Sequence, residues 1–531
     1  MDLSINERKI RLIHEKKIAC FFLFMIVALA VANADCYVSP PGGYGTNNPP
    51  YTNWADAATN IHWAVDVATN GETVWVTNGN YALTNQIVVT NGIVLKSVNG
   101  RTNTFINGNY PACSNRCFCI SNASAVVDGF TMSNAYFSNS VVGGAGACIY
   151  AGLMQNCVVF SNFFYDGNTN SIKCGGAGVY LEQTAMISNC LVYGNVAFGY
   201  AADGGGVFMT NGGTVVNCVI SNNGTVTASN SIYGGGMVML SRGQVINSQI
   251  KNNRGRYGGG IYCTGGIITG CVVSGNYVSM NGNGIFSDGT SNVYVYSTVF
   301  NDNTGSFGTW VIYNQSYPTN FFLINCIVTN NISSDGIVFI SGVASNCIIV
   351  NNVVGVRLRY GSSYLYNCVI ECNSQRGILI AENAGSAVSC CTVASNYSSG
   401  QGGGIRIESS NSNVRISNCI IVSNTAAGGY NDICDATAGN IHVANVFYSC
   451  AGSFSGFSGV GNITNVNPCF LDFLGRNYRL SVNSPCINAG TNESWMANAA
   501  DLDGRQRIRY GTVDMGAYET IYEGTVYRFG F

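Results

Sequence analysis

The sequence repeats one short motif along most of its length. The motif is an asparagine, a cysteine and an aliphatic residue, as in Asn156-Cys157-Val158, and a second asparagine follows five residues after the cysteine, as Asn162 does here. Successive copies lie 21 to 33 residues apart. A period of this length with irregular spacing is typical of a solenoid whose turns carry loops of different length.

Both repeated positions recur in register along the chain. The cysteines are Cys157, Cys190, Cys218, Cys271, Cys326, Cys347, Cys368 and Cys419. The asparagines five residues on are Asn162, Asn195, Asn223, Asn276, Asn331, Asn352, Asn373 and Asn424. The same spacing also joins Ser248 to Asn253, Thr298 to Asn303, Cys391 to Asn396 and Gly129 to Asn134.

Stacking of the turns gives each repeated position a structural role. Turns about 4.8 Å apart would place equivalent residues over one another, so we expect the asparagines to form a ladder that satisfies backbone groups of the turns. We expect the cysteines to form a buried apolar column. An unbridged column is favoured, because free cysteine packs as a small hydrophobe. Disulfides between neighbouring turns remain the alternative, since the spacing of the turns allows them.

Each copy also contains a short alternating apolar segment, such as Val158–Phe160 or Ile348–Val350, whose β-branched residues indicate a strand. Glycine clusters such as Gly204–Gly206 precede many strands and permit tight corners with positive φ. With 47% hydrophobic and 9% charged residues, the chain is too apolar for disorder. We predict an all-β fold, a single-stranded right-handed parallel β-helix (solenoid) with an N-terminal capping helix and a small C-terminal cap.

The first residues are typical of a secretory signal peptide. Basic residues from Arg8 to Lys17 precede an apolar run from Ile18 to Ala32, and small residues follow. We predict a signal peptide over 1–34 with cleavage before Asp35, and an uncleaved anchor is the alternative. No later apolar run is long enough to span a membrane. The bulk of the chain is therefore expected to be exported, either secreted or held at a bacterial cell surface or outer membrane.

Both ends of an open solenoid need covering. In residues 35–110 we predict an amphipathic helix from Trp54 to Ala68, followed by the first coils with strands at Thr73–Val76, Ile87–Thr90 and Ile93–Lys96. The repeats are expected over 111–450. Residues 451–531 are expected to form a capping or anchor-like segment, because the repeat fades there while charge and proline increase.

Two parts of the chain resemble known families. Three motifs in the tail, Asn483–Gly490, Asp501–Arg505 and Val513–Glu519, resemble the choice-of-anchor domain of secreted bacterial β-helix proteins. The repeats resemble the pectin-lyase-like right-handed β-helix superfamily, and their glycine and asparagine pairs are also similar to polymorphic outer membrane proteins of chlamydiae. The superfamily resemblance implies the architecture and includes polysaccharide lyases and glycoside hydrolases, without fixing a reaction.

Candidate catalytic residues are few. Arg357 and Arg359 alternate on one strand and could grip the carboxylates of a uronate chain. A solvated face with loose ion pairs is the favoured interpretation. Asp432 and Asp435 come nearest to the paired carboxylates of a glycoside hydrolase, but the surrounding glycine-rich segment favours turn capping.

Metal and disulfide sites are equally sparse. Asp501 and Asp503 faintly resemble the start of a calcium loop, although ion pairs within the tail are favoured. No other cofactor is expected. Cys469 and Cys486 are the predicted disulfide pair. The cluster Cys113, Cys117 and Cys119 lacks a fourth ligand, so local disulfides or core packing are favoured over zinc.

A formal net charge of −2 and scattered basic residues argue against nucleic acid as a partner. Two hypotheses remain. In the first, the protein is a non-catalytic glycan-binding, adhesion or structural rod whose polar and tyrosine-bearing face binds a polysaccharide or cell-surface glycan. In the second, it is a polysaccharide lyase or glycoside hydrolase acting in a groove along the β-helix. The sequence does not predict an oligomeric state.

Overall fold

The structure is a computed structural model that describes residues 34–521 except 139–141, 168–173, 200–201, 227–232, 307–308, 316–319, 333–334, 340, 383–384, 409–413, 437–444, 454–456 and 458. The predicted signal peptide therefore lies outside the described residues, apart from its last position. Within the described ranges, no helix is both long enough and apolar enough to cross a membrane.

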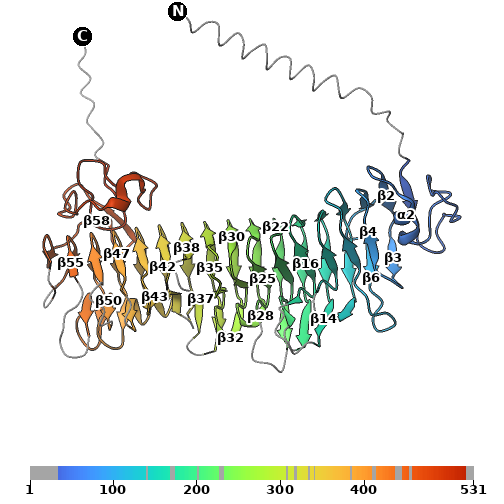
Figure 1. The fold of residues 1–531 in the computed structure, drawn as a ribbon. Helices are drawn as coiled ribbons and strands as arrows, with labels where there is room; N and C mark the ends of the chain where they lie inside the picture. The colour runs from blue at the N-terminus through green and yellow to red at the C-terminus, as the bar shows by residue number, and fades with distance from the viewer. Residues whose placement is uncertain are drawn as a thin grey trace, which may run out of the picture.

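The predicted parallel β-helix is confirmed. Short strands stack into long parallel sheets that together form a rod (Figure 1). In the part of the chain that the structure describes, there are two 16-stranded sheets, a 14-stranded sheet and a 7-stranded sheet. We call these sheets A to D. The two 16-stranded sheets are sheet A, from β1 (Cys36–Val38) to β55 (Asn445–Phe447), and sheet B, from β3 (Gly79–Ala82) to β57 (Ile463–Thr464). Sheet C has 14 strands, from β4 (Ile87–Val89) to β54 (Ile433–Asp435), and sheet D has seven, from β10 (Tyr136–Ser138) to β36 (Thr304–Gly305).

One coil passes through the four sheets in the order A, B, D and C. A representative coil contains β12 (Leu153–Gln155), β13 (Val158–Phe160), β14 (Phe163–Asp166) and β16 (Val179–Glu182). The next coil pairs in parallel and in register, so that β13 lies beside β18 (Leu191–Tyr193). The predicted strands at Val158–Phe160 and Ile348–Val350 (β42) match those of the structure.

The asparagine before each cysteine makes the corner between sheets A and B. Asn156, Asn189 and Asn217 have φ values of 54°, 52° and 53°. This left-handed conformation is costly for most residues but is tolerated by asparagine. The repeated Asn-Cys pair is therefore a corner signal: the asparagine turns the chain and the cysteine enters the core.

The predicted asparagine ladder lies at the next corner, between sheets B and D. Asn195 donates its backbone N–H and its side-chain amide to Oδ1 of Asn223, at 3.0 Å in both cases. Asn223 donates in the same way to Asn253. The coil predicted from Gly129 to Asn134 departs from the expected spacing by one residue. There Ala135, and not Asn134, donates its N–H to Asn162.

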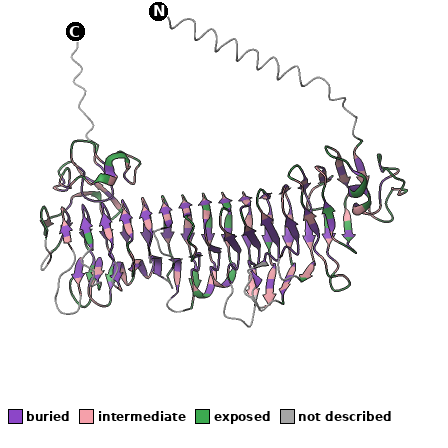
Figure 2. Ribbon diagram, viewed as in Figure 1, coloured by how far each residue is buried: buried purple, intermediate pink, exposed green. Residues whose placement is uncertain are grey.

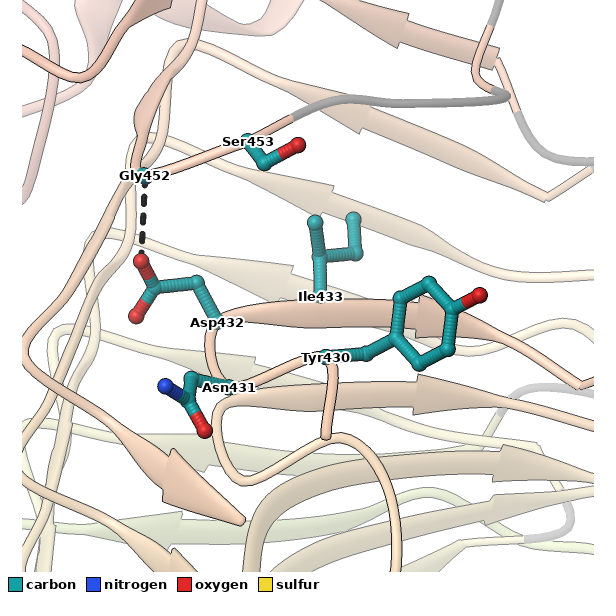
Figure 3. A pocket seen from close by; sticks show the side chains of 6 residues that line it. All are labelled: Tyr430, Asn431, Asp432, Ile433, Gly452 and Ser453. Carbon is teal, nitrogen blue, oxygen red and sulfur yellow. Dashed lines mark hydrogen bonds between the residues drawn. The ribbon is translucent and has the colours of Figure 1, made fainter. Parts of the chain in front are cut away.

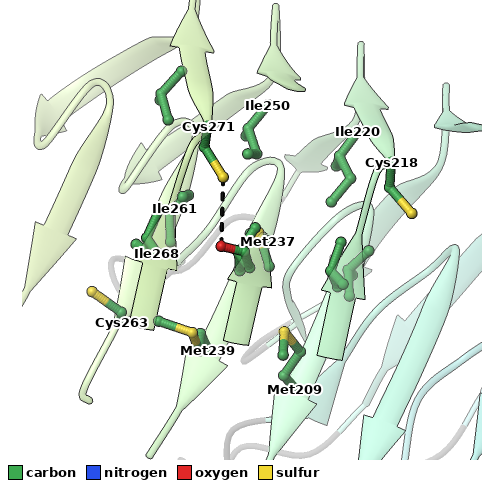
Figure 4. Close-up of a cluster of buried hydrophobic side chains, with 14 of the residues drawn as sticks. Met209, Cys218, Ile220, Met237, Met239, Ile250, Ile261, Cys263, Ile268 and Cys271 are labelled. Carbon is green, nitrogen blue, oxygen red and sulfur yellow. Dashed lines mark hydrogen bonds between the residues drawn. The ribbon is translucent and has the colours of Figure 1, made fainter. Parts of the chain in front are cut away.

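The cysteine column is buried and unbridged, and it is also hydrogen-bonded. Figure 4 shows Cys218 and Cys271 among aliphatic and methionine side chains of the core. Cys218 Sγ donates to the Val216 carbonyl at 3.2 Å and accepts the Cys190 N–H at 3.4 Å. Ser248 takes over both roles one coil later, donating to the Ile246 carbonyl and accepting from Cys218. The expectation of a purely apolar column was too simple, which explains why serine and threonine replace cysteine there.

Glycine is needed where the ladder packs against the start of a sheet C strand. A Cβ on Gly206 would lie 2.6 Å from the Gly236 carbonyl oxygen and 2.8 Å from Nδ2 of Asn223. Both distances are shorter than real Cβ contacts, so a side chain would push the ladder away. The first glycine of the same cluster, Gly204, has a φ of 63°.

The N-terminal helix is shorter than predicted. Helix α2 spans Ile61–Val67 and starts at Asn60, whose side chain accepts the His62 N–H. The residues from Trp54 are not helical, because the Asp56 N–H is bonded to the Asn53 side chain in a turn. Ala57 and Ala58 are buried without being helical. Their apolar side chains therefore made the helical spacing of apolar residues appear to begin too early in the sequence. The helix packs against β1 and β4 at the N-terminal end of the rod.

The tail packs against the last coils as a cap (Figure 1). It contains the antiparallel pair β58 (Phe470–Asp472) and β59 (Asn477–Leu480) and the 3₁₀ helix η1 (Ser494–Asn498). Long-range bonds fix it: Glu493 accepts from Ser417 Oγ at 2.6 Å, and Tyr478 donates to Glu371. Whether this segment also anchors the protein stays a prediction.

Candidate functional site

A row of aromatic side chains covers the outer surface of sheet A near its middle. We call it the tyrosine face, formed by the outward residues of β34 (Val293–Tyr296), β38 (Phe321–Ile324), β41 (Val343–Ser345) and β44 (Tyr364–Tyr366). Strand alternation produces it, since every second residue points into the core. Figure 2 shows this alternation of buried and more exposed residues along the strands.

The aromatic rings of the tyrosine face are aligned along the rod. The register places Tyr294, Phe322, Val343 and Tyr364 opposite one another on successive strands. The Tyr294 and Phe322 rings stack with centroids 5.0 Å apart and an interplanar angle of 15°. The result is a partly exposed aromatic row that Val343 interrupts between Phe322 and Tyr364.

A second row runs beside the first. Tyr296 and Tyr366 occupy it, and their ring planes lie 2° and 20° from those of Tyr294 and Tyr364 on the same strands. Trp495 of the cap stacks on Tyr366 with centroids 4.3 Å apart. The cap therefore borders the tyrosine face at its C-terminal end.

The tyrosine face is uncharged. The four strands that form it contain no acidic or basic residue. Asn292 donates its side-chain amide to the Tyr294 hydroxyl at 2.9 Å. Burial raises the pKa of Tyr366 to about 12, with smaller contributions from Tyr364 and Glu493, so this hydroxyl keeps its proton at neutral pH. The surface thus offers aromatic rings and neutral hydroxyl groups. Sequence reasoning missed its location because the register between coils was unknown.

The arginine face predicted from the sequence lies on sheet C. Arg357 and Arg359 point outward from β43 (Val354–Arg359), as alternation requires. Arg357 Nε lies 2.9 Å from Asp335 Oδ2, and Arg359 makes a two-point ion pair with Glu382. Both guanidinium groups are therefore paired with carboxylates of the chain itself, Arg357 through one nitrogen and Arg359 through two.

The neighbouring coils extend this ion-pair cluster. Arg406 Nε binds Glu408 at 2.6 Å, two coils beyond Arg357. Burial raises the pKa of Asp335, and the Arg357 charge partly offsets that effect. The arrangement supports the predicted ion-pair face. A substrate carboxylate would compete with Asp335 or Glu382 for these guanidinium groups.

Asp432 lines a pocket at the C-terminal end of the rod. The pocket has a volume of about 340 Å³ and is shown in Figure 3. Asp432 Oδ1 accepts the backbone N–H and the side-chain amide of Asn424 at 3.1 and 3.0 Å, and Oδ2 accepts the Gly452 N–H at 3.0 Å. Burial raises the pKa of Asp432. Asp435 does not line this pocket, so the two acids do not form a catalytic pair there.

The tail carboxylates do not fit a calcium ion. Asp501 is fully buried, and its oxygens accept the N–H groups of Asp503, Arg505 and Glu519 at 2.7 to 3.0 Å. Asp503 forms ion pairs with Arg479 and Arg505. Because these carboxylate oxygens already accept hydrogen bonds and ion pairs from the protein, they form a structural network and not a set of metal ligands. The predicted ion pairing in the tail agrees with this geometry.

The predicted Cys469–Cys486 disulfide is not formed. Both thiols are free, and Cys469 Sγ donates to the Asn467 carbonyl at 3.4 Å. Cys486 is buried and packs beside Cys450 of the last coil instead. Sequence proximity suggested the wrong partner, because the cap folds back over the coils. No group of three or more metal-binding side chains occurs within the described residues.

One comparison with known proteins, a family match, agrees with the fold over part of the chain. The family described as "Right handed beta helix region" matches residues 177–354. No curated protein matches the chain significantly. The chain is similar to a solved pectate lyase, Pel9A, at 14% identity, over 91% of this chain and 96% of the other, with a TM-score of 0.25.

Two further structures show similarity at the same level. The mannuronan C-5 epimerase AlgE6 A-module of Azotobacter vinelandii is 12% identical over 74% of this chain and 95% of its own, with a TM-score of 0.30. The Dettilon tailspike protein gp208 is 14% identical over 78% of this chain and 70% of its own, with a TM-score of 0.33. These scores are too low to transfer a site or a reaction. The strand register shows that the chain folds as a parallel β-helix, and its residues 177–354 match the family of right-handed β-helix regions.

Proposed function

We propose that this protein is an exported β-helix rod that binds a polysaccharide or a cell-surface glycan on the tyrosine face, without catalysing a reaction. The observation that carries the proposal is the alignment of Tyr294, Phe322 and Tyr364, with Val343 between the last two, on strands without charged residues. Export rests on the predicted signal peptide over 1–34.

Sugar rings suit this surface chemically. A pyranose ring has an apolar face of C–H groups and a rim of hydroxyls. Tyrosine offers an apolar ring face together with a polar hydroxyl, and stiff rings lose little conformational entropy on binding. The row of rings follows the rod axis, which favours an extended chain over a single sugar. The lack of charge favours neutral glycans over uronates.

The alternative function is that of a polysaccharide lyase or glycoside hydrolase, with Arg357 and Arg359 contacting an acidic chain. The observation in its favour is the grouping of both guanidinium groups on one outward strand. Their ion pairs with Asp335 and Glu382 weigh against it, because substrate binding would leave these carboxylates without partners.

Binding by the mature chain, starting at Asp35, tests the first function. The chain is first applied to a glycan array. Each glycan that it binds is then tested by calorimetry with the unmodified chain and with the double variant Tyr294→Ala/Tyr364→Ala. Since a stacked ring contributes about 1 kcal/mol, we expect the affinity to fall at least about tenfold. The matched control is Phe160→Ala/Tyr193→Ala, which removes a stacked pair with centroids 5.4 Å apart on sheet B.

The control variant should bind like the unmodified chain. Equal losses in both variants, or no loss in either, would contradict the proposed site. Ultraviolet and reducing-end assays on acidic and neutral polysaccharides test the alternative. Product formation that is lost in Arg357→Ala/Arg359→Ala would favour the enzyme.

A further inference from the structure

Two cysteines meet on the outer side of sheet C, away from the buried column. Strands β7 (Phe118–Ile120) and β11 (Ala147–Ile149) are parallel neighbours, and the register places Cys119 opposite Cys148. The residues that flank each cysteine on its strand belong to the interior core, so both thiols point outward. Cys148 lies in the outer cluster that includes Tyr180.

The two thiols differ in access. Cys119 is partly exposed, whereas Cys148 is fully buried. Each is within hydrogen-bonding contact of the other. The column cysteines, in contrast, lie inside the coils and donate to backbone carbonyls, as Cys190 does to Ser188 at 3.3 Å. Reagents in solution can therefore reach the outward pair through Cys119.

A buried arginine stands beside the pair. Arg116 is only 7% exposed, and its guanidinium lies 3.7 Å from the ring centroid of Phe137. One terminal nitrogen donates to the carbonyls of Val142 and Gly143, at 3.4 and 3.2 Å. Its Nε is buried without a hydrogen-bond partner among the described residues. Among the residues that the structure describes, no carboxylate forms an ion pair with this guanidinium.

These neighbours make Cys119 the more acidic thiol. The hydrogen bond from Cys148 and the Arg116 charge lower the pKa of Cys119 to about 6, against the opposing effect of burial. The bond to Cys119 and burial raise the pKa of Cys148. Of the two sulfurs, the partly exposed Cys119 is therefore the one that loses its proton first. An exposed thiolate next to a second thiol is the arrangement of a reactive dithiol.

We propose that Cys119 and Cys148 form a reactive dithiol, which a small-molecule disulfide oxidises to a disulfide between two adjacent coils. Neighbouring strands lie about 4.8 Å apart, within the Cα range of about 4.4 to 6.8 Å that a disulfide spans. No movement of one coil past another is needed, and the bond would join the coils of β7 and β11 covalently.

The reaction balances in two exchanges. The Cys119 thiolate attacks one sulfur of the oxidant, forms a mixed disulfide and releases the other half as a thiolate. The Cys148 thiol then gives its proton to that thiolate, and its sulfur attacks the Cys119 sulfur. The bond between Cys119 and the oxidant breaks, and a second thiolate leaves and takes a proton from water. Two protein thiols are oxidised, and one external disulfide is reduced to two thiols.

Oxidised glutathione, added to the reduced mature chain under native conditions, tests the proposal. Peptide mass spectrometry should find Cys119 linked to Cys148. In Cys148→Ser we expect glutathione to remain on Cys119, because the second exchange is lost. In Cys119→Ser neither product should form. The matched control is Cys113→Ser, which removes another partly exposed thiol of the same segment and should leave the link unchanged.

The pH dependence of Cys119 alkylation gives a second readout, which can be measured first on the unmodified chain. The rate of Cys119 alkylation by iodoacetamide should rise with a midpoint near pH 6, the lowered pKa of this thiol. In Cys148→Ser the midpoint should move toward about 8.5, the value of an unperturbed cysteine. A midpoint near about 8.5 in the unmodified chain, or the absence of both the linked peptide and the glutathione adduct in the folded chain, would overturn the proposal.

Discussion

Asp432 takes the place of the next asparagine above Asn424 in the ladder. Its Oδ1 accepts the Asn424 N–H and side-chain amide at 3.1 and 3.0 Å, the same two bonds that Asn424 Oδ1 receives from Asn396 one coil earlier. Its Oδ2 accepts the Gly452 N–H in addition. An aspartate at this point ends the ladder and ties it to the following segment.

Replacing Asp432 should therefore affect stability more than any activity. Asp432→Ala removes the acceptor of the Asn424 and Gly452 backbone N–H groups, and we expect the free energy of unfolding to fall by about 1 to 3 kcal/mol. Asp432→Asn keeps the Asn424 bonds but points an N–H at that of Gly452, so a smaller loss is expected. Urea denaturation followed by circular dichroism measures both. Equal losses in the two variants would show that the ladder bonds do not matter.

The cysteine column should tolerate serine better than alanine. Cys218→Ser keeps a donor for the Val216 carbonyl and an acceptor for the Cys190 N–H, as Ser248 does one coil later. Cys218→Ala leaves that N–H without an acceptor, at a cost of about 1 to 3 kcal/mol. Denaturation midpoints of the two variants provide the comparison. A more stable alanine variant would indicate that packing alone determines this position.

Arg357 should stabilise the fold in a pH-dependent way. Burial raises the pKa of Asp335 above its ordinary value, so the folded state keeps this proton where the unfolded state has lost it. Stability from this group is therefore largest at acid pH and falls as the pH rises through the folded-state pKa. Arg357→Met removes the opposing charge and should raise that pKa further. We expect the variant to lose about 1 to 2 kcal/mol more at neutral pH than near pH 4, with the loss discounted for the partial exposure of Arg357.

The control for this pair is the double variant Arg357→Met/Asp335→Asn. It removes the buried carboxylate, so most of the extra loss at neutral pH should disappear. Denaturation at both pH values gives the comparison. A loss in Arg357→Met that is the same at both pH values would mean that this arginine contributes packing and not charge.

The cap should depend on Glu493. Its Oε1 accepts from Ser417, Asn418 and Ser389, and its Oε2 accepts the Trp495 indole N–H at 2.8 Å. Glu493→Ala should cost about 1.5 to 3 kcal/mol locally, because hydrogen bonds to a charged group are the stronger kind. Hydrogen exchange should then speed up in the cap and along the last coils while the middle coils stay protected. Uniform loss of protection along the rod would contradict a local role.

Much of the fold followed from the repeat, because its fixed positions mark two of the corners of each repeated coil. Asn162 and Cys157 could be assigned to a ladder and a column without coordinates, since stacking places equal positions over one another. The limits of helix α2 could not be predicted, because Ala57 and Ala58 are buried by the coils and mimic a helical period.

The candidate site was less predictable for a different reason. Tyr294 and Tyr364 are separated by coils with loops of different length, so only the observed register shows that they share one row. The same holds for Cys119 and Cys148, which belong to no repeated motif. Arg357 and Arg359 were correctly placed on one outward face, but their carboxylate partners come from other coils and could not be identified.

A crystal structure of the mature chain with a glycan selected on the array tests the central claim most directly. We predict ordered sugar rings over Tyr294, Phe322 and Tyr364, with successive sugars following the rod axis. Sugar density on sheet C beside Arg357, or at the pocket of Asp432, with the tyrosine face empty, would contradict the account.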